Sequence, residues 1–304
     1  MATSQSLQRS QAPSSVSQAG RILILSTFCS VAVSIAAWQY LNSANDCRPP
    51  PEGFECVYCG PQLTAIRSKL NPSIFAVLAT QTDDSDGLVV QSYLDLKHRI
   101  SRSPYIERIL QILKKFGRRN ILLLGLGGGS VPALAITRIR DCKLTAVDIS
   151  PDSLRIVRQF VQPDDGVHVR YVQQSAEEFL KSKRSEQFDV VIEDMYDDAD
   201  VPGFIYDREY MQNIHRVLNI DGMFISNVFM PEGHKDRVTR SLGTINSFFY
   251  EFGVSELGRN GNVILVASKI AKNLKTLTDM SLKAREIGDE REYDILIQNG
   301  RNEP

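Results

Sequence analysis

Five short apolar runs alternate with helical patterns over residues 120–249, and no other feature of the chain constrains its fold as strongly. The predicted strands have the sequences ILLLG, KLTAVD, HVRYVQ, FDVVIED and GMFISNV. Helices are predicted between and after these strands, at 131–140, 151–161, 176–182, 207–218 and 235–249. Because apolar strands separated by helices favour a parallel sheet that is covered on both faces, the sequence predicts an α/β fold.

Two more apolar runs, VSELG and NVILVAS, end this pattern on either side of residues 258–261. They predict a final hairpin, and therefore a mostly parallel sheet with one antiparallel strand. The main domain is predicted over 118–269, followed by a C-terminal helix and tail over 270–304.

Size and charge limit what such a domain can do. The chain has 304 residues, of which 42% are hydrophobic, which suits one medium domain with extensions. A net charge of −1 gives no sequence-independent attraction to nucleic acid. The four histidines share no metal-ligand spacing, so no metal site is predicted from His98, His168, His215 and His234.

The N-terminal residues predict a membrane anchor. Residues 1–21 are rich in Ser, Gln and Ala, which is typical of a disordered tail. The next twenty residues, 22–41, carry no charge, and a helix of this length spans the ~30 Å hydrocarbon core, with Trp38 and Tyr40 near the interface. The alternatives are a buried helix and a signal peptide with Ser34 and Ala36 as its small cleavage-site residues.

The flanks of this span predict its orientation. Arg9 and Arg21 precede it without any acid, so the positive-inside tendency places the main domain in the lumen or outside the cell. Residues 42–72 are predicted to be a linker rich in Pro and Cys. In an oxidising compartment one disulfide is expected there, which leaves an odd thiol among Cys47, Cys56 and Cys59.

A hairpin and a helix are predicted over 73–117. The runs SIFAVLAT and GLVVQSYLDL flank a DSDG turn, as in a β-hairpin. The segment SPYIERILQILKKFG has Ser103 at the N-cap position, Pro104 in the first turn and Gly117 at the end, as in a helix.

Four glycines follow the first strand of the alternating pattern: they are Gly125, Gly127, Gly128 and Gly129. With Ser130 as the expected N-cap, the stretch predicts a strand–turn–helix junction whose backbone N–H groups face a ligand crevice. The dinucleotide-binding pattern G-x-G-x-x-G would need a glycine at position 130, so the glycines could serve a nucleotide or only a tight packing corner.

Acids and small polar residues follow the next three strands. Asp148 comes nineteen residues after Gly129, where a carboxylate can accept both ribose hydroxyls or only favour the start of a helix. Ser175 lies after the third strand, at the expected height of an adenine ring. The acidic segment EDMYDDAD, which contains Asp194 and Asp197, ends the fourth strand and is either a substrate site or a solvated loop.

With these motifs, residues 73–269 resemble the spermidine-synthase superfamily of class I folds that bind S-adenosylmethionine (SAM). The stretch GLGGGSVP resembles the non-polyamine branch typified by the C-terminal domain of methyltransferase-like protein 13, which methylates protein amino groups. The resemblance implies that the four glycines line SAM, that Asp148 and Ile149 hold its nucleoside, that Ser175 and Ala176 frame adenine, and that Gln91 reaches the cofactor from the N-terminal hairpin. It further implies a Y-x-E motif at Tyr105 and Glu107, and catalytic roles in binding an amine for Asp194 and Asp197.

Two departures from the family pattern bear on the reaction. Polyamine synthases carry an acid where this chain has Ser130, and the missing acid favours intact SAM and methyl transfer. Ser175 replaces an acid that often meets adenine, which leaves room for a catalytically silent relative. The expected activity is methyl transfer to an amine of a protein or small molecule; an aminopropyltransferase and a silent scaffold are the alternatives, and a homodimer is a further expectation.

Overall fold

The computed structural model describes residues 50–80, 88–162, 165, 168–183, 187–196, 202–229, 240–241, 243–245, 247–249, 251–256, 262–270 and 298–299. The expected tail and anchor at 1–41 lie outside these residues, as do Asp197 and most of the expected C-terminal helix. Among the described residues, no helix combines the length and the apolar character needed to cross a membrane.

An antiparallel sheet of five strands forms the N-terminal part. Its strands follow one another in chain order: β1 (Phe54–Cys59), β2 (Leu63–Ser68), β3 (Ile74–Thr80), β4 (Leu88–Asp95) and β5 (Ile100–Ser101). The strands β3 and β4 confirm the predicted hairpin. The prediction of a linker up to residue 72 is wrong, because β1 and β2 already pair within it.

The cysteines of this region differ in state. Cys59, at the end of β1, is disulfide-bonded, and Cys47 lies outside the described residues. Cys56 is a free thiol, half-buried, and its Sγ donates to the backbone oxygen of Tyr58. Burial raises the pKa of the free thiol of Cys142 to about 12, and only 2% of this side chain is exposed, as expected for a small core residue.

Helix α1 (Pro104–Lys115) links the two sheets. Pro104 occupies its first turn, where a missing N–H costs nothing, and Glu107 in the first turn and two lysines in the last complement the helix dipole. Its apolar side chains recur every three to four residues and are buried on one face: Ile106, Ile109, Leu110, Ile112 and Leu113.

The main sheet has eight strands in the order β13-β11-β12-β10-β9-β6-β7-β8. Their bounds are β6 (Asn120–Leu124), β7 (Lys143–Asp148), β8 (Val169–Gln173), β9 (Phe188–Glu193), β10 (Leu218–Phe229), β11 (Glu251–Glu256), β12 (Asn262–Ser268) and β13 (Gln298–Asn299). The pairs β8–β7, β7–β6, β6–β9 and β9–β10 are parallel, whereas β12 runs antiparallel to β10 and to β11. The predicted mixed sheet of a Rossmann-like fold is confirmed, with β13 as a further antiparallel strand.

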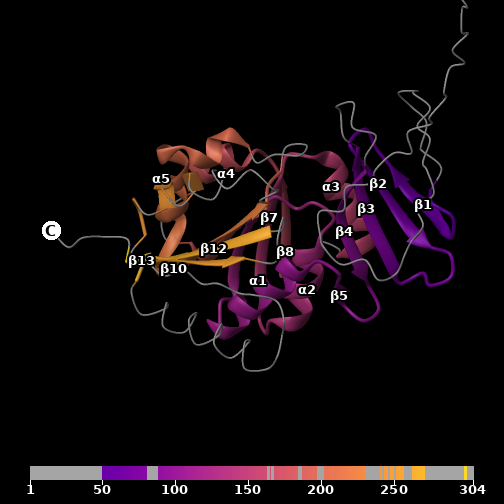
Figure 1. The fold of residues 1–304 in the computed structure, drawn as a ribbon, viewed down its shortest axis with the longest axis horizontal. Coiled ribbons are helices and arrows are strands. Elements are labelled where there is room, and N and C mark those ends of the chain that lie inside the picture. Colours follow the sequence, from indigo (N-terminus) through magenta and orange to yellow (C-terminus); the bar gives the residue numbers. More distant parts are fainter. Residues whose placement is uncertain are drawn as a thin grey trace, which may run out of the picture.

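Helices cover both faces of this sheet (Figure 1). The helical elements after α1 are α2 (Ser130–Arg138), α3 (Pro151–Ile156), the π-helical turn η1 (Val157–Val161), α4 (Ala176–Ser182), the 3₁₀ turn η2 (Gly203–Tyr206) and α5 (Arg208–Val217). Alternate side chains of β6 enter two different cores: Ile121 and Leu123 pack with α1, α2 and α3, and Leu122 and Leu124 pack with α4 and α5. This alternation is what a strand buried on both faces requires.

The N-terminal sheet packs against the main domain through β3. Phe75 and Val77 belong to the core that also contains α1, α2 and α3, while Ala76 and Leu78 pack in a small core of the N-terminal sheet. Figure 1 shows this sheet beside α2 and α3. The hairpin strands therefore lie next to the glycine turn.

Candidate functional site

The glycine turn brings the ends of β6 and β9 into close contact. Gly125 has φ +88°, which L side chains rarely adopt, and a Cβ there would lie 2.2 Å from the backbone oxygen of Asp194. The N–H of Asp194 donates to the backbone oxygen of Leu124 at 2.8 Å. The absence of a side chain at position 125 therefore allows Asp194 to lie directly beside the turn.

The last two glycines bring other elements close to the turn. A Cβ on Gly128 would lie 2.2 Å from Cβ of Ser92 on β4, and one on Gly129 would lie 2.7 Å from a methyl group of Val157 in η1. The turn is thus enclosed by the N-terminal sheet and by the α3–η1 helix.

Ser130 does not have the expected role. It is the first residue of α2, and Gly129, with φ +81°, occupies the N-cap position. The Ser130 side chain is buried, and its Oγ shares a short hydrogen bond with Oγ of Ser92. The expected N-cap is wrong because Ser130 joins α2 to the N-terminal sheet.

Asp148, at the end of β7, holds the glycine turn in place. One of its oxygens accepts from the N–H of Leu126 and the other from the N–H of Ser150, each at 2.7 Å. Burial raises the pKa of the Asp148 carboxyl, while these N–H groups and that of Gly127 lower it. Because each carboxylate oxygen can accept two hydrogen bonds, and three backbone N–H groups already donate to Asp148, it retains capacity for one hydroxyl group of a ligand.

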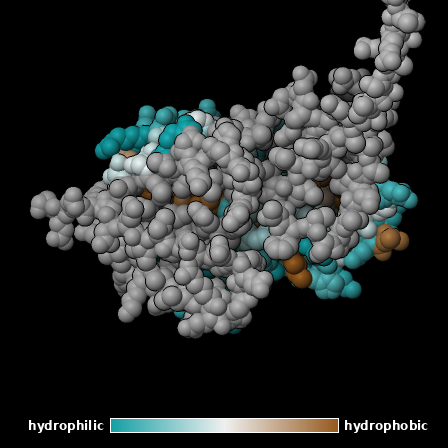
Figure 2. All heavy atoms as spheres, viewed as in Figure 1, coloured by the Kyte–Doolittle hydropathy of each residue, from teal (hydrophilic) through white to brown (hydrophobic). Residues whose placement is uncertain are grey.

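Asp148 is followed by an exposed apolar residue and lies beside the end of β8. Ile149 is 71% exposed although it is apolar. On the face that Figure 2 shows, the visible hydrophobic side chains of described residues lie apart from one another. The N–H of Gln174 donates to the backbone oxygen of Asp148 at 3.1 Å, so the ends of β7 and β8 lie side by side. The strand end that precedes Ser175 thus lies beside Asp148, whose next residue in the chain is exposed and apolar.

Ser175 and Ala176 lie next to this position, at the start of α4. Ser175 is the N-cap of α4, and its Oγ accepts from the N–H of Glu178 at 3.2 Å. Ala176 is buried. The N-cap role of Ser175 was not predicted from the sequence. The acids two and three residues later are a recognisable signal of such a cap.

Gln91, which the resemblance implied to reach the cofactor, approaches the glycine turn from β4. Its Oε1 lies 3.8 Å from where a Cβ on Gly127 would be. Tyr105 and Glu107, which the resemblance implied to form a Y-x-E motif, contact different elements. Glu107 forms an ion pair with Arg138 of α2 at 2.6 Å, whereas Tyr105 reaches Asp194.

Asp194 lies half-buried at the end of β9, between side chains from three elements. The Tyr105 hydroxyl donates to its Oδ2 at 3.3 Å, and the Asn227 amide donates to its Oδ1 at 2.7 Å. Burial raises the pKa of the Asp194 carboxyl to about 6 despite these two bonds. Asp197, the expected second acid, lies outside the described residues.

Asn227 is a site residue that the sequence did not reveal. Its Oδ1 accepts from Asn262 at 2.9 Å and its backbone oxygen accepts from the Tyr196 hydroxyl at 3.0 Å. Asn227 and Asn262 are both buried. These hydrogen bonds orient the Asn227 amide so that its N–H points at Asp194. They depend on the pairing of β10 with β12, which no local sequence motif encodes.

Glu193 lies behind Asp194, within the core. It is 4% exposed and accepts a hydrogen bond from Ser226 Oγ at 2.8 Å. Burial, and to a smaller extent the neighbouring Asp194, raise the pKa of the Glu193 carboxyl to about 7.

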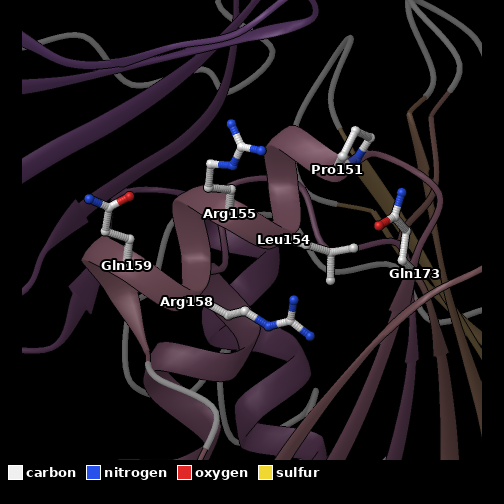
Figure 3. Close-up of a pocket in the computed structure, with 6 residues that line it drawn as sticks. All are labelled: Pro151, Leu154, Arg155, Arg158, Gln159 and Gln173. Carbon is white, nitrogen blue, oxygen red and sulfur yellow. The ribbon is translucent and has the colours of Figure 1, made fainter.

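A cavity of about 350 Å³ lies beside the end of β8, lined by Gln173 and by residues of α3 and η1. Figure 3 shows Arg155 and Arg158 projecting from the helix in different directions. Both guanidinium groups have aromatic neighbours, because Arg155 lies 5.9 Å from the Tyr58 ring centre and Arg158 lies 5.6 Å from that of Tyr171. Because Gln173 pairs with Asp148, this cavity borders the carboxyl ends of β7 and β8, where doubly wound sheets bind ligands.

Comparisons with known proteins agree with this geometry. A family model described as a methyltransferase domain matches residues 121–222. A polyamine aminopropyltransferase of Neisseria meningitidis is 25% identical over 174 residues, which are 56% of this chain and 64% of that protein. The chain thus spans less than two thirds of the length of this curated relative.

Solved structures show the same architecture. A probable spermidine synthase from Corynebacterium glutamicum has a TM-score of 0.64 and 16% identity, covering 83% of this chain and 91% of its own. Human methyltransferase-like protein 13, solved in complex with SAH, has a TM-score of 0.47 and 20% identity, covering 60% and 87% of the two chains, too low to assign a branch. The likeness to the probable spermidine synthase shows the fold alone.

Proposed function

We propose, from the spermidine-synthase-like class I methyltransferase fold of this chain, that it is a SAM-dependent methyltransferase acting on an amine of a protein or small molecule. The observation that carries the proposal is one edge of the sheet, where Asp148 binds the glycine turn and Asp194 lies beside that turn. A nucleoside at Asp148 and a cationic acceptor at Asp194 would therefore lie on either side of the same glycine turn.

SAM is the proposed cofactor, bound along the carboxyl ends of β6, β7 and β8. Asp148 would accept a ribose hydroxyl, and Ile149 would cover one face of the adenine. The glycine turn, of which Gly125, Gly127 and Gly129 all have positive φ, would follow the methionine part closely. Gln91 would contact the cofactor from the N-terminal sheet.

Asp194 is proposed to bind the acceptor amine and to take its proton. An ammonium group attracted by Asp194 must become neutral before its nitrogen can attack the sulfonium methyl. A carboxyl with a pKa of about 6 is ionised at neutral pH and accepts a proton more readily than an ordinary aspartate. The C–N bond then forms as the S–C bond breaks, with its electron pair left on sulfur; alignment supplies much of the rate.

Two alternatives have specific support. The curated relative is named a polyamine aminopropyltransferase, which favours aminopropyl transfer. Against this, no acid occupies position 130, where polyamine synthases carry one, and the Ser130 hydroxyl is buried against Ser92. A catalytically silent protein of the same fold is the second alternative.

The test is a labelling experiment with two donors. Purified protein is incubated with a tissue extract and either methyl-labelled SAM or decarboxylated SAM labelled in its aminopropyl group. Methyl label in an acceptor supports the proposal, and aminopropyl label alone replaces it with aminopropyl transfer. Binding of SAM by calorimetry without transfer of either label would indicate a silent protein.

We also propose that residues 22–41 anchor the protein and that the main domain lies outside the cytosol. The disulfide at Cys59 supports this, since structural disulfides persist in oxidising compartments. Protease digestion of the main domain in sealed microsomes without detergent would reverse the orientation. Loss of residues 1–36 from the mature chain would establish a signal peptide instead. The proposed homodimer is tested by sedimentation.

A further inference from the structure

Asp152 is a buried residue of α3 whose carboxylate accepts hydrogen bonds from residues outside its own helix. Its side chain is 4% exposed, and its bonds cross to the N-terminal sheet. The Tyr58 hydroxyl donates to Oδ1 at 2.6 Å, and the backbone N–H groups of Gln62 and Leu63 donate to Oδ2 at 3.0 and 3.3 Å. One carboxylate thus binds both sides of the β1–β2 turn.

The turn fits closely around this carboxylate. A Cβ on Gly60 would lie 2.3 to 2.4 Å from all three carboxyl atoms of Asp152, so only glycine allows the approach. On the other side, the Tyr58 ring lies under the Arg155 guanidinium, with 5.9 Å to the ring centre. The residue before Gly60 is the disulfide-bonded Cys59, which restrains the same turn.

Two more contacts connect this turn to the candidate cofactor site. The Ser150 hydroxyl donates to Oε1 of Gln62 at 3.0 Å. The backbone N–H of Ser150 donates to Oδ1 of Asp148 at 2.7 Å. The turn at 60–63 therefore touches the residue that orients the acid of the cofactor site.

We propose that Asp152 is a positioning residue for the cofactor, which holds the β1–β2 turn against the end of β7 and so fixes Ser150 and Asp148 before the cofactor binds. The inference rests on the proposed function, because it assigns Asp152 to the binding of SAM. Hydrogen bonds to a charged acceptor are stronger than those to a neutral one, and a preordered site avoids the cost of ordering on binding.

Asp152→Asn is the main test. An Asn side chain offers one acceptor oxygen where the carboxylate offers two, so its amide group must face either the Tyr58 hydroxyl or the two backbone N–H groups. We expect calorimetry to show at least tenfold weaker SAM binding for this variant than for the full wild-type chain.

Asp189→Asn is the matched control. Asp189 also accepts two backbone N–H groups, those of Arg119 and Asn120 at 3.2 and 3.0 Å, but at the opposite ends of the strands. We expect this variant to lose stability as Asp152→Asn does while keeping wild-type SAM affinity within twofold. Equal losses of affinity in both variants would reduce the role of Asp152 to general stability and overturn the proposal.

Hydrogen exchange gives a readout that needs no cofactor. The amide hydrogens of Gln62 and Leu63 should exchange at least tenfold faster in Asp152→Asn than in wild type, and unchanged exchange would show that Asp152 does not hold the turn. Should Asp152→Asn fail to fold, Tyr58→Phe removes one bond only, and we expect roughly threefold weaker SAM binding from it; unchanged affinity would overturn the proposal.

The outcomes separate the two proposals. Wild-type protein that binds no SAM removes the proposed function, and this inference with it. Wild-type binding with unchanged affinity in Asp152→Asn leaves the proposed function standing and removes only the role of Asp152.

Discussion

The two ends of the same parallel strands use polar side chains differently. At the amino ends, Asp189 accepts from two backbone N–H groups and from Asn219, and Arg118 binds both the carboxylate and the backbone oxygen of Asp221. These groups bond to one another and join strands. At the carboxyl ends, burial raises the pKa of Asp148, Glu193 and Asp194 above their usual range.

This difference indicates the end of the sheet at which we expect a ligand to bind. Burying three carboxyl groups near one edge of the sheet costs desolvation free energy and so lowers the stability of the fold. Such a cost is typical of functional sites, where the buried groups serve binding or catalysis. Polar groups at the amino ends join strands of the sheet, whereas the proposed function assigns those at the carboxyl ends to a ligand that supplies hydroxyl or cationic groups. The predictions below test this contrast.

Gly125→Ala should have the largest effect. A methyl group there would overlap the Asp194 backbone, and φ is +88°, so we expect a loss of about 3 kcal/mol or more in the free energy of unfolding. Gly203→Ala is the control, because nothing lies within 4 Å of its Cβ position. Urea denaturation measures both, and similar stabilities for the two variants would contradict the tight contact.

Asp194→Asn should reduce turnover by about a hundredfold or more, which is about 2.7 kcal/mol in the activation free energy, and leave SAM affinity nearly intact. The wild-type rate should rise with pH up to and beyond about 6, as Asp194 loses its proton, and the variant should lack this rise. Single-turnover rates at saturating SAM decide it. A rate within twofold of wild type would make the acidic segment a solvated loop.

Asp148→Ala should weaken SAM binding by roughly 1.5–3 kcal/mol, the scale of hydrogen bonds to a charged group. Part of the loss would come from the glycine turn, since Leu126 loses its acceptor. Calorimetry measures the affinity, with Asp189→Asn as the control at the other end of the strands. Unchanged affinity would remove Asp148 from the site.

Glu193→Gln should have the smallest effect and one that depends on pH. Because burial raises the pKa of Glu193 from 4.5 to about 7, the folded state holds this proton more tightly than the unfolded state. Stability from this group is therefore full below pH 4.5 and is lost as pH rises through about 7, by about 1–3 kcal/mol.

The measurement compares unfolding free energies at pH 5 and pH 8. Between pH 5 and pH 8 the free energy of unfolding should fall less in the variant than in wild type. The part of this fall that comes from the titration of Asp194 should be the same in both proteins. Equal losses in the two proteins would show that Glu193 titrates normally.

The alternating pattern was enough to predict the main sheet, because strands such as ILLLG are buried on both faces and carry a strong apolar signal. The strands β1 and β2 were missed, since prolines and cysteines nearby suggested a linker and the pairing partner lies on the next strand. The strand–turn–helix junction at the glycines and the place of Asp148 at the end of the next strand could be predicted because both follow from the local pattern of residues.

Other site residues could not be found in this way. Asn227 contacts Asp194 and Tyr196 only after β9, β10 and β12 have paired, and Asn is common in many contexts. Ser130 was misplaced because its partner, Ser92, is on a different sheet. Side chains whose function depends on distant pairing leave no signal at a fixed spacing.

The contacts between the N-terminal sheet and the glycine turn bear on the order of folding. Ser92 meets Ser130 across 38 positions of the chain, and Tyr58 meets Asp152 across 94. Contacts of high sequence separation form slowly, because the entropy of closing the chain is lost before the contact is gained. We therefore expect the binding site to mature late during folding, after both sheets exist, so that during synthesis the chain passes through a period in which it has a core but no competent site.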